Sequence, residues 1–115
     1  MLAALLAVAV RPPAAYIDAG KTRVPLTISS WCWAARCAAP IARSRHIAVT
    51  QRGAVVRIEL AFAPTEVRLV IGGTPVKVNV QKGMLSWRAT RGGGISLTAT
   101  GVHGFVTYVG RLGLR

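Results

Sequence analysis

Apolar and polar residues alternate from Val55 almost to the end of the chain, in short runs that turn signals separate. Val56, Ile58 and Leu60, for example, fall on one face of an extended segment. A period of two predicts β-strands, because successive side chains of a strand point to opposite faces of its sheet. Glycine and proline mark the turns, as expected where the backbone needs positive or fixed φ. These turn signals stand at residues 63–65, 72–73, 82–83, 91–94 and 101–104.

Two further runs, at residues 24–30 and 46–50, bring the count to about eight short strands, and no window indicates a helix. Turns spaced by roughly 8–12 residues are typical of a sandwich or barrel. We therefore predict an all-β fold, an immunoglobulin-like antiparallel β-sandwich of about seven to nine short strands. The predicted core is Val56, Ile58, Leu60, Phe62, Val67, Leu69, Ile71, Val78, Leu85, Trp87 and Leu97, with Phe105 or Val106 from the last strand.

The 115 residues are enough for one domain, and a nine-residue apolar run, Leu2 to Val10, precedes it. Nine residues are too few to span a bilayer, which takes about 20, but they fit the apolar part of a secretory signal. Cleavage would follow Ala15, although Pro13 stands where a small residue is preferred and no Lys or Arg precedes the run. The prediction is a signal-peptide remnant or apolar segment over 1–15 and a single β-sandwich over 16–115. The alternative is an N-terminal helix or strand packed on the core.

The chain has two cysteines, Cys32 and Cys37. In a secreted or extracytoplasmic protein a disulfide is the expected state, and so small a ring contributes roughly 2 kcal/mol. Two reduced structural cysteines are the alternative. The spacing is not the Cys-x-x-Cys of thiol redox enzymes. Zinc would need His46 and His103 as further ligands, in a spacing that no compact zinc module has, so we predict neither metal nor cofactor.

The stretch Ser30-Trp31-Cys32-Trp33, followed by Cys37-Ala-Ala-Pro40 and a β-rich run, resembles a group of small, uncharacterised extracytoplasmic bacterial proteins. Those carry Ser-Tyr-Cys-Trp…Cys…Pro ahead of an immunoglobulin-like segment, and Trp31 here replaces the usual tyrosine. The resemblance covers about residues 24–112. It implies export and a disulfide, and it supplies no reaction.

The chain is strongly basic, with fifteen Lys and Arg against three acids and a net charge of +12. Such a charge attracts polyanions of any kind. Basic residues beside aromatics suit single-stranded nucleic acid, and the candidate binding surface is Trp31, Trp33, Arg36, Arg43, Arg45 and His46. The alternative is an evenly basic surface, since the other arginines occur in nearly every predicted strand and turn. The two tryptophans would then anchor the loop that contains Cys32 and Cys37 to the core. Nucleic acid would bind weakly and only at low salt.

The candidates for catalysis are few. No serine lies in Gly-x-Ser-x-Gly, and the glycines at 92–94 lack the Lys-Ser/Thr of a phosphate loop. An enzyme would need a cleft that brings His46 or His103 next to Asp18 or Glu59. We predict no catalytic residues.

Glu59 shares the polar face of its predicted strand with Arg57. If the strand that follows formed a hairpin with it, Arg68 would lie opposite. This arrangement predicts a cross-strand ion pair rather than an acid/base couple.

Together these patterns predict a non-catalytic, exported module of the cell envelope with a binding or structural role. Its partner would be an anionic envelope polymer or another envelope protein. The alternative is a basic polyanion- or nucleic-acid-binding β-domain. Salt dependence separates the two, because charge-driven affinity falls steeply as salt rises.

Overall fold

The computed structural model describes residues 11–19, 22–40 and 46–115, which form twelve strands in two sheets. In that part of the chain, no helix has the length and apolar character that crossing a membrane requires. The first sheet has the order β2 (Thr22–Pro25), β1 (Ala15–Ala19), β6 (Val55–Leu60), β10 (Met84–Arg88) and β9 (Asn79–Gln81). The second has the order β4 (Arg36–Ala38), β3 (Thr27–Trp33), β12 (Gly104–Leu114), β11 (Gly93–Gly101), β7 (Glu66–Ile71) and β8 (Thr74–Val76), and β5 (His46–Thr50) also pairs with β12.

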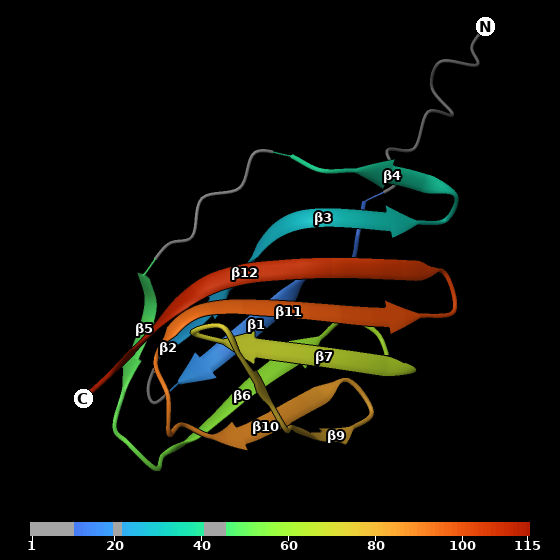
Figure 1. Ribbon diagram of the computed structural model, residues 1–115. Helices are drawn as coiled ribbons and strands as arrows, with labels where there is room; N and C mark the ends of the chain where they lie inside the picture. The colour runs from blue at the N-terminus through green and yellow to red at the C-terminus, as the bar shows by residue number, and fades with distance from the viewer. Residues whose placement is uncertain (1–10, 20–21, 41–45) are drawn as a thin grey trace, which may run out of the picture.

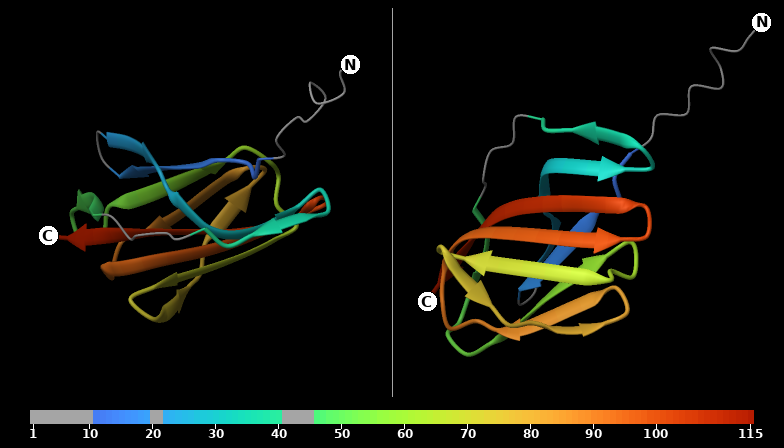
Figure 2. Two further views of the ribbon diagram at one scale, coloured as in Figure 1. Left: turned by 90° about the horizontal axis from the view of Figure 1, so that it is seen from above. Right: turned by 45° about the vertical axis from the view of Figure 1, so that its right-hand side comes forward.

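The two sheets pack face to face as a sandwich, and their strand order is immunoglobulin-like (Figures 1 and 2). In that fold strands A, B, E and D form one sheet, and strands G, F, C and C′ the other. Here β1-β6-β10-β9 and β12-β11-β7-β8 follow these two orders in the same sequence along the chain. All pairs are antiparallel except β5 and β12, which run parallel. The predicted fold class is confirmed.

The structure has more strands than the eight that alternation predicts, because two predicted strands change sheets midway. The run over 24–30 divides at Leu26, where the chain leaves β2 in the first sheet and enters β3 in the second. The run over 76–80 divides in the same way between β8 and β9. Alternation continues through both crossings, so the pattern alone does not reveal them. The remaining two strands, β1 and β4, have no counterpart in the prediction.

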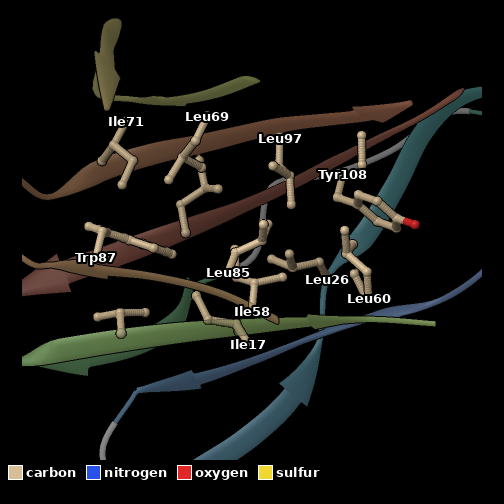
Figure 3. Close-up of a cluster of buried hydrophobic side chains, with 14 of the residues drawn as sticks. Ile17, Leu26, Ile58, Leu60, Leu69, Ile71, Leu85, Trp87, Leu97 and Tyr108 are labelled. Carbon is tan, nitrogen blue, oxygen red and sulfur yellow. The ribbon is translucent and has the colours of Figure 1, made fainter. Parts of the chain in front are cut away.

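The core lies between the sheets and contains most of the predicted residues (Figure 3). Of the predicted set, the buried members are Val56, Ile58, Leu60, Leu69, Ile71, Leu85, Trp87, Leu97 and Val106. Phe62, Val67 and Val78 are half-buried and pack against this cluster. In the last strand Val106 points inward and Phe105 is half-buried, which settles the open choice between them. The core also takes in Ile17, Leu26, Ile95, Tyr108 and Leu112, which the prediction omits.

The segment before β1 is tied to the sandwich. The hydroxyl of Tyr108, buried in the core, donates a hydrogen bond of 2.6 Å to the carbonyl oxygen of Pro13. The Ala61 amide donates to the carbonyl of Ala14 at 3.1 Å, and Ala15 itself is buried. Cleavage after Ala15 would therefore remove three carbonyls that pair with the folded domain, since the Ala15 carbonyl accepts from the Leu26 amide at 2.9 Å. The boundary between residues 15 and 16 stays a prediction.

The predicted partner of Glu59 is wrong. The chain crosses from the first sheet to the second between β6 and β7, so Arg68 lies in a different sheet from Glu59. Arg23 on β2 forms the ion pair instead, with 2.9 Å from its Nη2 to Oε2 of Glu59. The Arg23 guanidinium also lies over the ring of Tyr16, 4.5 Å from its centre. The pair is exposed on the outer face of the first sheet, where such pairs contribute little to stability.

Candidate binding surfaces

A disulfide-closed hairpin at one edge of the second sheet holds both cysteines. Strands β3 and β4 pair antiparallel with Cys32 directly opposite Cys37, their Cα atoms 4.0 Å apart, and the two sulfurs are bonded. The predicted disulfide is confirmed. Only Ala34 and Ala35 connect the strands, with φ of +50° and +66°. Positive φ at both positions is the type I′ pattern, which favours Asn and Gly and strains most residues with a Cβ, such as alanine.

The tip of this hairpin is attached to the turn between β11 and β12. The Ala34 amide donates a hydrogen bond of 2.9 Å to the carbonyl of His103. Next to it, Gly104 has φ of +141°, and a Cβ there would collide with the carbonyl oxygen of Cys32. Glycine is therefore required where β12 approaches β3 most closely. The hairpin is held by a covalent bond across its strands and by this contact at its tip.

The two tryptophans of the hairpin pack inward. Trp31 and Trp33 are half-buried against the core cluster. The Trp33 ring meets Phe62 edge-on, with 4.9 Å between the ring centres, and His103 in the same way at 5.7 Å. Such edge-to-face pairs add to the energy of burial. A ligand can therefore reach little of Trp33.

An open hollow of about 330 Å³ lies between the hairpin and β12. Cys32 and Phe105 stand opposite each other across the β3–β12 pair, so the disulfide and the phenyl ring share the outer face of the sheet. The surface of the hollow is mostly apolar and suits a small apolar group rather than an anion. Its walls are Ser30, Trp31, Cys32, Cys37, Ala38, Ala39 and Phe105.

The structure separates the other predicted surface residues. Arg36 is exposed on β4 and lies near Gly104, at the start of β12. His46 begins β5 and pairs with Arg111, near the other end of β12. Arg43 and Arg45 lie outside the described residues. Arg36 and His46 are therefore not neighbours, and the candidate binding surface as a whole stays a prediction.

The residues considered for catalysis also lie apart. His103 sits in the β11–β12 turn of the second sheet, against Trp33. Asp18 is on β1 in the first sheet, opposite Arg23 and Arg57, and Glu59 is paired with Arg23. Among the described residues, no three His, Cys, Asp or Glu side chains lie close enough to hold a metal ion.

Comparison with known proteins gives matches among solved structures. No family model matches the chain, and no curated protein matches it. Two chains among solved structures match, one of them titled "Structure of Titin M4 trigonal form". That match has 13% sequence identity and a TM-score of 0.44, and covers 92% of this chain and 100% of the other.

Proposed function

We propose that this chain is a non-catalytic, exported domain of the cell envelope that presents its disulfide-closed hairpin to another envelope component. The observation that carries the proposal is the Cys32–Cys37 bond. Disulfides persist in oxidising compartments and are rare in the cytosol. Cys37 is exposed, so reducing agents would reach the bond in a reducing compartment. The apolar run Leu2 to Val10 supports the same location.

The hairpin and its hollow support a binding role. The disulfide and the hydrogen bond from Ala34 to His103 hold the hairpin in one conformation, which lowers the entropy lost when a partner binds. The hollow offers an apolar contact between Cys32, Cys37 and Phe105, and β4 is an edge strand. These features favour a protein partner with a small apolar side chain over a free anion.

Thiol trapping in the native host tests the location. Cells are acid-quenched and fractionated, and the protein is treated with a maleimide polymer before and after reduction. We expect no adduct before reduction, two adducts afterwards, and the protein in the extracytoplasmic fraction. A chain found in the cytosol with two free thiols would overturn the proposal.

Crosslinking tests the binding role separately. A photoreactive residue placed at Phe105 should crosslink to a discrete envelope protein. The matched control places the same group at Thr98, on the neighbouring strand β11 and away from the hollow. Equal crosslinking from both positions, or none from either, would contradict the binding role and leave export standing.

A further inference from the structure

Five arginines gather at the end of the sandwich opposite the disulfide hairpin, which we call the basic end. They come from three segments far apart in the sequence: the β5–β6 turn, the segment from the end of β10 towards β11, and the end of β12 with the residue after it. These segments meet at the left of Figure 1, whereas the β3–β4 and β11–β12 turns lie at the right. All five side chains are exposed. They are Arg52, Arg88, Arg91, Arg111 and Arg115.

Backbone hydrogen bonds hold the three segments together. The Gly53 amide donates to the carbonyl of Ala89, and the Ala89 amide donates to the carbonyl of Ala54, both at 2.8 Å. The Arg115 amide donates to Thr50 at 2.9 Å, and the Arg52 amide to Arg115 at 3.3 Å. The positions of the arginine backbones are therefore set by the fold.

Two of the arginines are further fixed by their own side chains. Nη1 of Arg52 donates to the carbonyl of Thr90, and Nη1 of Arg88 donates to the carbonyl of Gly53, both at 3.0 Å. Each guanidinium thus crosses to the neighbouring loop and keeps further N–H groups for a ligand. Arginines held in this way lose less conformational entropy on binding an anion than free ones.

Acidic side chains lie elsewhere. All three acids of the chain are in strands, and Glu59 is engaged by Arg23. Asp18 lies opposite Arg23 and Arg57, and Glu66 is opposite Thr100 at the hairpin end. Among the described residues, the pair between Arg23 and Glu59 is the only ion pair. In the part of the chain that the structure describes, no acidic side chain therefore forms an ion pair with an arginine of the basic end.

We propose that the basic end binds a linear phosphodiester polymer through its phosphates. The planar guanidinium fork matches the phosphate group and can bind it with two parallel hydrogen bonds. The aromatic side chains lie in the core, at the hairpin end or on the outer face of the first sheet, so no aromatic platform for base stacking accompanies these arginines. Recognition then depends on the phosphodiester backbone of the polymer and, for a nucleic acid, is independent of base sequence.

A membrane surface fits the basic end less well. Peripheral membrane binding combines basic residues with apolar side chains that enter the interface. Of the large apolar side chains that are exposed, Val102 is the most exposed at 85% and lies in the β11–β12 turn, at the opposite end. Near the basic end, Val55 at the start of β6 is the only exposed large apolar side chain among those described, with an exposed fraction of 38%.

The test compares two triple variants with equal loss of charge. Arg91, Arg111 and Arg115 make no side-chain hydrogen bond among the described residues, so changing all three to Gln should leave the fold intact. The matched control changes Arg68, Lys77 and Lys82 to Gln, away from the basic end. The probes are a short single-stranded DNA, a glycerol-phosphate polymer and vesicles containing anionic lipid.

We expect the basic-end variant to bind both polymers at least tenfold more weakly, and the control variant no more than threefold more weakly. For DNA, the slope of log affinity against log salt should fall by about 2 in the basic-end variant, since each phosphate contact on a single strand contributes about 0.7. Whichever polymer binds more tightly identifies the source of the phosphodiester.

A second variant tests geometry at constant charge. Arg52→Lys with Arg88→Lys keeps the charge but removes the two guanidinium groups that backbone carbonyls hold in place. We expect polymer affinity to fall threefold or more. Equal losses in the two triple variants would overturn the proposal, as would wild-type affinity in the basic-end variant. Binding to vesicles without binding to either polymer would overturn it in favour of a membrane surface.

Discussion

Replacing Tyr108 by Phe should destabilise the domain by about 1–2 kcal/mol. The buried hydroxyl donates a hydrogen bond of 2.6 Å to the carbonyl of Pro13, which lies far away in the sequence. The substitution removes one net hydrogen bond and leaves a half-buried carbonyl without its donor, and these losses are together of that size. Equilibrium urea unfolding, followed by tryptophan fluorescence, measures the effect. A loss below about 0.3 kcal/mol would refute the claim that this contact fastens the N-terminal segment.

Truncation separates the contact from a general effect of the substitution. Removing residues 1–13 deletes the acceptor, so Tyr108→Phe should cost little more in that background. The coupling between the two changes should be about 1 kcal/mol. The control truncation removes residues 1–10 and keeps Pro13, and there the full cost of Tyr108→Phe should remain. If Tyr108→Phe lowers the free energy of unfolding by the same amount in both truncated chains, the hydroxyl does not act through Pro13.

The same hydroxyl predicts how stability depends on alkaline pH. Burial raises the pKa of Tyr108 above its ordinary value. The unfolded chain loses this proton near pH 10, while the folded chain still holds it, so the contribution of Tyr108 is complete below about pH 10 and declines above it. The free energy of unfolding of the wild type should therefore fall towards that of Tyr108→Phe as the pH passes 10. A difference that stays constant up to about pH 11 would contradict this.

Three further changes test the hairpin and the core by urea unfolding. Changing Cys32 and Cys37 together to Ala should cost roughly 2 kcal/mol, as should reduction of the wild type, and a cost of zero would show that the ring does not constrain the unfolded chain. Ala34→Asn with Ala35→Gly should stabilise the domain by about 1 kcal/mol, because these residues accept positive φ, and a loss would contradict the type I′ geometry. Leu69→Ala should cost about 2–5 kcal/mol, since this side chain is buried between the sheets. A cost below about 1 kcal/mol would mean that β7 presents its other face to the core.

The fold and the disulfide were predictable from local signals. Alternation identifies the inward face of each strand because a strand buried on one face exposes the other, and Leu69 and Val56 lie where this rule places them. The glycines at 72–73 mark their hairpin because both have positive φ. Cys32 and Cys37 were predictable as a pair because the chain has no other cysteine.

The missed features depend on tertiary contacts that leave no local pattern. Nothing in the sequence around Leu26 distinguishes a strand that continues from one that crosses to the other sheet. The strand β1 has no counterpart in the prediction because it begins at Ala15, where the predicted signal segment ends. The partner of Glu59 was wrong for a related reason, since a short connection was interpreted as a hairpin when it crosses between the sheets.

The sorting of charge to one end follows from the topology of the fold. In a sandwich of antiparallel strands the chain reverses at every turn, so successive turns lie at opposite ends. The β5–β6 turn with Arg52 and the segment with Arg91 therefore share one end. The β9–β10 turn with Lys82 lies at the other end, where β7 also begins with Glu66 (Figure 1). Arginines spread evenly along the sequence are in this way collected in space. An even distribution in sequence therefore does not by itself predict an even surface, and the basic end can be recognised only once the order of the strands is known.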